Sequence, residues 1–303
     1  RHHLASGRPA VYASAETHGW ILKALNVLGL PAESWRRVPV DSEFKTNVAV
    51  LDRMLAEDRA AGWSPFCLIG TAGTVNTGST DPLVQLAKLA RRERIWFHVD
   101  AAWGGAALLD DELRPHLAGI EMADSITFDA HKWLSAPMGA GILLTRRPEM
   151  LERCFHTGND YMPKEAAGLP VVDPYQSSMQ WSRRFIGLKV FLSLAVAGWE
   201  GYAATIRHMT RMGCLLREQL EAGGWEIVNR TPLPLVCFAD RDGADAERIA
   251  MDVVSSGEAW ISTVMLPAGR RVLRACVTNY NTREEDIRSL CETLDRARAR
   301  CSR

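Results

Sequence analysis

The sequence has few lysines and no excess of either charge. Only six of its 36 basic residues are lysines, and 36 acidic residues bring the formal net charge to zero. A balanced chain lacks the positive field that attracts nucleic acid or an anionic membrane, so we predict neither partner. Because the chain uses arginine for most positive charges, each lysine is a candidate for chemistry that needs an amine able to lose its proton.

The sequence also lacks paired cysteines, spaced metal ligands and a long apolar run. Its seven cysteines are scattered without a CxxC pattern, which is typical of reduced thiols in a cytoplasmic protein. His2 and His3 have no spaced partner, so we expect no metal site. The longest apolar run, residues 185–198, contains Lys189 and is too short to cross a membrane. The chain starts without Met or a signal peptide and runs into a strand-like segment, and we expect part of a domain to precede it.

Short apolar runs alternate with helical periods over residues 9–145. The runs predict strands at residues 10–13, 35–40, 66–69, 95–99, 125–128 and 142–144. Helical periods fill residues 18–28 and 48–61, and a third helix should start with Asp81 as N-cap and Pro82 as its first residue. This alternation predicts an α/β fold with a mostly parallel sheet, whose chemistry gathers at the carboxyl ends of the strands.

The second half of the chain has a different composition. Residues 154–178 are rich in Gly, Pro and polar residues, which predicts a lid or catalytic loop. Residues 184–222 predict one long helix, broken near Gly198. Strands at 225–228, 235–238 and 272–277, with helices at 244–255 and 284–299, then predict a smaller α+β domain. We therefore divide the chain into an incomplete large domain, residues 1–185, and a connecting helix with a small C-terminal domain, residues 186–303.

Polar residues follow three of the predicted strands. Asp100, in FHVDAAWGG, either satisfies a turn or caps the next helix, or it is a buried carboxylate that faces a cation. The segment IGTAGTVNTGSTD could cradle a phosphate, but it matches neither GxGxxG nor a P-loop and is a weak signal. Lys132 follows a third strand, in DSITFDAHKWL. An amine that can form a Schiff base, with a carboxylate that can keep a pyridine nitrogen protonated, predicts pyridoxal 5'-phosphate as cofactor.

The order and spacing of five segments resemble those of the group II pyridoxal-phosphate-dependent amino acid decarboxylases. The segments are YASAETHGW, IGTAGTVNTGSTD, FHVDAAWGG, DSITFDAHKWL and WSRRFIGLKVF. The resemblance implies an aspartate-aminotransferase-like fold of type I and decarboxylation of an L-amino acid, aromatic or related, to its amine. It also implies a homodimer with active sites at the interface. The family's phosphate-binding loop and part of its substrate pocket precede the first of these segments and would lie outside this chain.

The resemblance assigns roles to residues around the cofactor. Lys132 would form the Schiff base, and Asp100 would pair with the pyridinium nitrogen. His18, which by itself is typical of a capping or core residue at a helix start, would stack on the cofactor ring. Ala102 would pack on the opposite face of the ring, and Thr71 would hydrogen-bond near the cofactor.

Further positions follow from the same resemblance. His131 would lie near the phosphate or the substrate. Tyr161, 29 residues after Lys132, would protonate the substrate carbon after CO2 leaves, although by itself it fits an incidental loop residue. Arg274 matches a small-domain arginine whose role the resemblance does not define. Asp129 stands where many members have asparagine, and because its charge would repel phosphate we do not assign it to phosphate binding.

Two other functions fit the same scaffold. A pyridoxal-phosphate-dependent aldehyde synthase would deaminate an aromatic amino acid oxidatively, but the presence of both His18 and Tyr161 argues against it. A non-catalytic paralogue would keep the fold for dimerisation or regulation, and the set of Lys132, Asp100 and His18 argues against that. We therefore predict a carboxy-lyase whose small-molecule substrate is an L-amino acid, aromatic or related.

Overall fold

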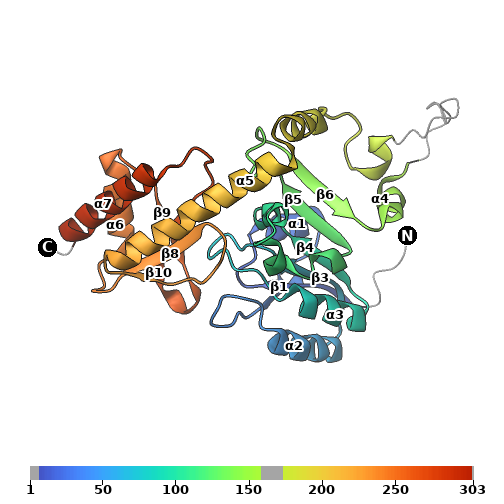
Figure 1. The fold of residues 1–303 in the computed structure, drawn as a ribbon. Helices are drawn as coiled ribbons and strands as arrows, with labels where there is room; N and C mark the ends of the chain where they lie inside the picture. Colours follow the sequence, from blue (N-terminus) through green and yellow to red (C-terminus); the bar gives the residue numbers. More distant parts are fainter. Residues whose placement is uncertain (1–6, 158–172, 302–303) are drawn as a thin grey trace.

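A six-stranded sheet forms the centre of the N-terminal part of the chain (Figure 1). The computed structural model describes residues 7–157 and 173–301. Neighbouring strands in the order β2-β1-β3-β4-β5-β6 are parallel, except for the antiparallel pair β5 and β6. The strands are β1 (Arg8–Ser14), β2 (Trp35–Val38), β3 (Trp63–Thr71), β4 (Trp96–Asp100), β5 (Ser125–Asp129) and β6 (Gly141–Thr145). The predicted α/β fold with a mostly parallel sheet is confirmed.

Alternate residues of β1 are buried under helices on opposite faces of this sheet. The helices are α1 (Trp20–Val27), α2 (Val48–Ala60) and α3 (Leu83–Glu93). Tyr12 belongs to one apolar cluster with Leu51 of α2 and Leu86 of α3. Its neighbour Val11 belongs to another cluster with Ile21 of α1. Successive strand residues point to opposite faces, so a strand buried on both sides reads as a continuous apolar run.

The start of α3 differs from the prediction. Pro82, and not Asp81, occupies the N-cap position, and no side chain caps this helix. The carboxylate of Asp81 instead accepts hydrogen bonds from the backbone N–H groups of Thr46 (2.7 Å) and Thr71 (2.8 Å). Burial raises the pKa of Asp81, although both N–H donors favour its charged form. The prediction of an Asp81 cap was wrong because two distant backbone donors compete for the same carboxylate.

The long helix α5 (Ile186–Ala222) runs from the large sheet to the C-terminal part of the chain (Figure 1). Gly198 interrupts it with φ 64° and ψ 179°, a region that essentially only glycine adopts, so the predicted break is confirmed. Beyond the break, Ile206 packs into the apolar core of the large sheet and Leu216 into that of the C-terminal sheet. One helix therefore joins both cores.

The C-terminal part contains a four-stranded antiparallel sheet in the order β7-β8-β10-β9. Its elements are β7 (Trp225–Ile227), β8 (Leu235–Asp240), α6 (Ala246–Ser256), β9 (Ser262–Met265), β10 (Arg271–Cys276) and α7 (Glu284–Cys301). The prediction omits β9, whose four residues carry no clear apolar pattern and are defined by pairing with β10. The division into two domains at residue 185 stays a prediction.

The remaining elements are short. They are α4 (Pro148–Phe155) and the 3-10 helices η1 (Ala32–Ser34), η2 (Gly104–Leu109), η3 (Arg114–Leu117), η4 (Ile120–Met122), η5 (Pro174–Ser177) and η6 (Pro267–Gly269). The predicted loop of residues 154–178 therefore starts inside α4 and contains η5 near its end.

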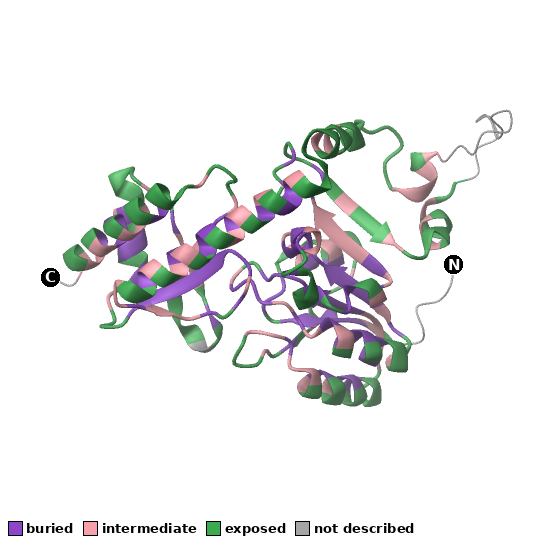
Figure 2. Cartoon of the chain, viewed as in Figure 1, coloured by how far each residue is buried: buried purple, intermediate pink, exposed green. Residues whose placement is uncertain are grey.

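The first half of α5 and strand β6 are largely exposed (Figure 2). Large apolar side chains are exposed there, among them Leu188, Phe191, Val196, Leu143 and Leu144. Exposed apolar surface of this extent is typical of a contact with another chain or segment. No helix within the described ranges is long and apolar enough to cross a membrane.

Candidate active site

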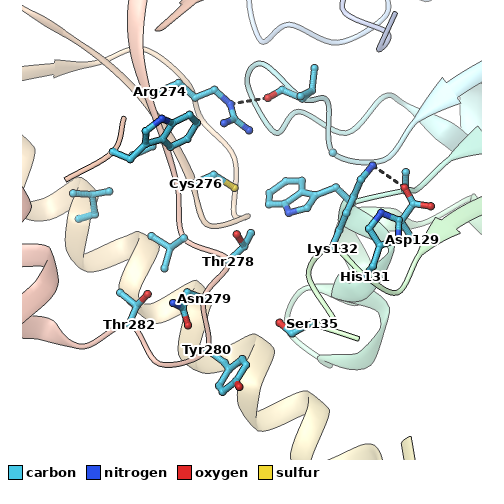
Figure 3. A pocket seen from close by; sticks show the side chains of 18 of the residues that line it. Asp129, His131, Lys132, Ser135, Arg274, Cys276, Thr278, Asn279, Tyr280 and Thr282 are labelled. Carbon is cyan, nitrogen blue, oxygen red and sulfur yellow. Dashed lines mark hydrogen bonds and ion pairs between the residues drawn. The ribbon is translucent and has the colours of Figure 1, made fainter. Parts of the chain in front are cut away.

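A cleft of about 1270 Å³ lies between the carboxyl ends of the large-sheet strands and the C-terminal sheet. The sequence-predicted residues that line it are His18, Thr71, Asp100, Ala102, His131, Lys132 and Arg274. Strand pairing explains part of this grouping, since Thr71 pairs with Asp100 across β3 and β4. Figure 3 shows Lys132 and His131 on one wall and Arg274 on the other. Tyr161 lies outside the described residues.

Asp100 ends β4 as a buried carboxylate, only 5% exposed. Its Oδ2 atom accepts a hydrogen bond of 2.6 Å from the indole Nε1 of Trp20, and its Oδ1 atom accepts one of 3.1 Å from the backbone N–H of Ala102. The second bond is the turn contact that the sequence allows. Among the described residues, Asp100 has no cationic partner, and a buried charge normally has one. The site therefore favours a cationic ligand group beside Asp100.

Lys132 lies in the turn after β5. Its Nζ atom forms an ion pair of 2.8 Å with Oδ2 of Asp129 (Figure 3). The Lys132 side chain is 42% exposed and that of Asp129 is 17% exposed, so the amine can be reached from the cleft while its partner is mostly covered. Asp129, which the sequence analysis did not assign to phosphate binding, thus binds the amine of Lys132.

Both histidines of the cleft are oriented through the same ring nitrogen. Nδ1 of His18 accepts a hydrogen bond of 3.2 Å from the backbone N–H of Trp20. Nδ1 of His131 accepts one of 3.2 Å from the backbone N–H of Ala140. When Nδ1 accepts, the proton of the neutral ring is on Nε2. In each neutral ring, Nε2–H is therefore the group left to bind a ligand.

The loop of residues 75–78, which follows Thr71, is held by the C-terminal part of the chain. Four consecutive carbonyl oxygens of this loop accept hydrogen bonds from Arg274 (2.7 Å), Cys237 (3.1 Å), Asn229 (2.7 Å) and Thr231 (2.8 Å). Burial raises the pKa of Cys237 to about 12, so its thiol keeps the proton that it donates. The two walls of the cleft are thus joined by side chains from one part of the chain and backbone from the other.

Comparison with known proteins agrees with this geometry. Residues 1–241 match the model of the pyridoxal-dependent decarboxylase conserved domain. The chain belongs to this family. The match includes every predicted cleft residue except Arg274, which lies beyond it.

Relatives and solved structures match this decarboxylase-family chain over most of its length. Aromatic-L-amino-acid decarboxylase of Bacillus atrophaeus is 32% identical over 292 residues, which cover 91% of this chain and 60% of the relative. Phenylacetaldehyde synthase of Arabidopsis thaliana is 31% identical over 292 residues, which cover 92% and 59%. The solved structure of Oryza sativa TDC with PLP and tryptamine has a TM-score of 0.91 at 28% identity and covers 98% of this chain and 64% of that one. The chain thus spans about 60% of the length of the curated relatives it matches.

Sequence reasoning about this decarboxylase-family chain missed Trp20. This tryptophan is the first residue of α1, lines the cleft and reaches a carboxylate 80 residues away. The available signal was its place two residues after His18 at a helix start. That signal shows that Trp20 lies near the site, but it does not show which strand end the indole reaches.

Proposed function

We propose that this chain carries the catalytic centre of a pyridoxal-phosphate-dependent carboxy-lyase that converts an L-amino acid to its amine. The observation that carries the proposal is the placement of two groups at neighbouring strand ends of one cleft. One is the reachable amine of Lys132, and the other is the buried carboxylate of Asp100 without a described cationic partner. The substrate class, aromatic or related, comes from the relatives and belongs to the proposal.

The residues present fit pyridoxal 5'-phosphate. Asp100 would bind the ring nitrogen, whose proton gives the carboxylate a cationic partner. Ala102 presents only a methyl group to the cleft, which leaves room for a flat ring. The buried hydroxyl of Thr71 has no hydrogen-bond partner among the described residues, which favours a polar ligand at this wall. When bound, the cofactor supplies an electron sink for the bond that breaks.

Lys132, Asp129 and the histidines would then handle protons around the cofactor. Lys132 must lose a proton before its Nζ atom can attack an aldehyde, and Oδ2 of Asp129, at 2.8 Å, is placed to accept it. His18, held through Nδ1, would present Nε2–H toward the ring and the substrate. His131 is held in the same way and would donate from Nε2 to the phosphate or the substrate. Tyr161 would give the final proton to the substrate carbon.

Aldehyde formation is a second candidate function because some relatives are named as aldehyde synthases. Besides the Arabidopsis thaliana protein, the solved structure of Rhodiola rosea 4-hydroxyphenylacetaldehyde synthase matches with a TM-score of 0.87 at 27% identity. We favour the amine because His18 lines the cleft and Tyr161 is present in the sequence. Both candidates use Lys132 and Asp100, so the product decides between them.

The proposal includes a homodimer in the cytoplasm. The exposed apolar side chains on β6 and the first half of α5 support a contact with a second copy. All seven cysteines are free, which supports a reducing compartment.

The test is CO2 release from a panel of L-amino acids by the purified full-length protein with added pyridoxal 5'-phosphate, because this chain spans about 60% of its relatives' length. The parent should release CO2 and show the visible absorbance of covalently bound cofactor. Lys132→Ala and Lys132→Arg should lose both, since a guanidinium cannot form the imine. Lys23→Arg, at an exposed position of α1, is the matched control and should behave as the parent. An active Lys132→Arg variant would overturn the proposal, and so would a parent without bound cofactor.

A further inference from the structure

The indole of Trp20 makes the shorter of the two hydrogen bonds to Asp100. Its Nε1–H group donates to Oδ2 at 2.6 Å, whereas the backbone N–H of Ala102 donates to Oδ1 at 3.1 Å. Each carboxylate oxygen therefore has one fixed donor, and each keeps a lone pair for a ligand. This hydrogen bond joins the first residue of α1 to the last residue of β4, which are 80 residues apart in the sequence.

The Trp20 ring is itself held by a buried histidine. It lies edge-on to the ring of His98, with centroids 6.2 Å apart and an angle of 76° between the planes. The two nitrogens of His98 are in turn bonded to Ser125 (2.8 Å) and Thr127 (3.1 Å) of β5. Burial lowers the pKa of His98, which keeps this neighbour neutral. The indole thus approaches Asp100 from a supported position.

We propose that Trp20 is a positioning residue that fixes the plane and the negative charge of the Asp100 carboxylate toward the ring nitrogen of the cofactor. This inference rests on the proposed function. An N–H donor stabilises the anionic carboxylate and restricts its rotation. Without this donor, Oδ2 loses its only described protein partner and the carboxylate can turn about Ala102. The ring nitrogen of the cofactor would then pair with a carboxylate whose orientation is less well defined.

Trp20 also connects the two groups that would contact the cofactor ring. Its backbone N–H orients His18 through Nδ1, and its side chain orients Asp100. Because these are different parts of one residue, Trp20→Phe removes the bond to Asp100 and leaves the bond to His18. The substitution also keeps a large aromatic ring against His98. It therefore isolates the indole N–H group.

The experiment compares the affinity of the full-length apoprotein for pyridoxal 5'-phosphate with its affinity for the 1-deaza analogue, in which carbon replaces the ring nitrogen. Equilibrium dialysis measures both in the parent and in Trp20→Phe. We expect Trp20→Phe to weaken binding of the natural cofactor about tenfold, the size of a hydrogen bond to a charged group. Binding of the analogue should change by less than about twofold, because it makes no bond to Asp100.

Trp225→Phe is the matched control, since its indole Nε1 also donates a hydrogen bond to a carboxylate, that of Asp295 at 3.0 Å, but Trp225 does not line the cleft. It should leave the ratio of the two affinities unchanged. If Trp20→Phe weakened the binding of both ligands equally, the Trp20 ring would contribute only packing. If it weakened the binding of neither, the hydrogen bond to Asp100 would not affect cofactor binding. Either result overturns the inference. A parent that binds neither ligand overturns the proposed function instead, and circular dichroism of each variant confirms that it is folded.

Discussion

The side-chain amide of Asn229 donates a hydrogen bond of 2.7 Å to the carbonyl oxygen of Thr77, 152 residues earlier in the chain. The same amide nitrogen also donates to the carbonyl of Leu235, and Oδ1 accepts from the backbone N–H of Cys237. Asn229 is buried, and all three of these bonds are inside the protein. One amide thus connects the C-terminal sheet to the loop that follows Thr71 in the cleft.

We predict that Asn229→Asp lowers the free energy of unfolding by about 3 kcal/mol. The substitution keeps the shape but replaces two N–H donors with an oxygen that faces two carbonyls. Chemical denaturation of the parent and the variant measures the difference. Thr231→Ser is the control, because it keeps the hydroxyl that donates to Gly78. An Asn229→Asp protein as stable as the parent would mean that the loop does not depend on this contact.

The large sheet could be predicted from the sequence because each strand is a short apolar run between helical periods. β1 shows why, since both of its faces are buried and every residue in its centre is apolar. Asp81 shows the limit of such reasoning. An acidic residue before Pro82 has the local pattern of a cap, but the fold brings two backbone donors to its carboxylate. Local pattern does not reveal that competition.

Some features of the candidate site could likewise be predicted from the sequence, and others could not. Lys132 and Asp100 could be predicted because parallel strands bring their carboxyl ends to one edge. The bonds of Trp20 to Asp100 and of Asn229 to Thr77 could not, because each joins side chains or loops from elements far apart in the sequence. Hydrophobic periodicity in the sequence does not show which distant group an indole or amide side chain will bind.

We predict that Asp100→Asn reduces decarboxylation about a hundredfold or more while the protein stays folded. The neutral amide is nearly the same size, but it no longer supplies the charge that keeps the ring nitrogen protonated. Steady-state CO2 release, with the cofactor saturating, measures the loss. Asp111→Asn, whose parent side chain is 88% exposed, controls for removal of an acidic charge at a distance from the cleft. A change of less than about threefold would mean that Asp100 serves only the turn.

Glu16 provides a pH-dependent prediction. It is buried, it accepts a hydrogen bond of 3.0 Å from Asn76, and burial raises its pKa above the ordinary value. A carboxyl whose pKa is higher in the folded state stabilises the fold fully below its unfolded pKa. This contribution is lost as the pH rises through the folded pKa. Glu16 should therefore oppose folding at neutral pH.

We predict that Glu16→Gln is more stable than the parent at neutral pH and that the difference disappears in acid. Glutamine keeps an oxygen acceptor for Asn76 without a charge to bury. Thermal unfolding of both proteins across a pH series measures the difference, and Glu33→Gln, at an exposed position, is the control. A variant less stable than the parent at neutral pH would show that the Glu16 charge is favourable where it is.

Tyr161 tests the reaction type. It lies outside the described residues, and its role as proton donor to the substrate carbon is a prediction from the sequence. Tyr161→Phe would remove the hydroxyl but keep the ring, so cofactor binding and CO2 loss should survive while protonation of the carbon slows. Molecular oxygen can then react with the electron-rich carbon in place of a proton. We expect the product to shift from amine toward aldehyde, with ammonia and hydrogen peroxide released alongside. The amine-to-aldehyde ratio, measured with and without oxygen, reports this shift.

A Phe variant that makes amine at the parent rate without aldehyde would assign the proton to another group, and His18, which lines the cleft, is a described candidate.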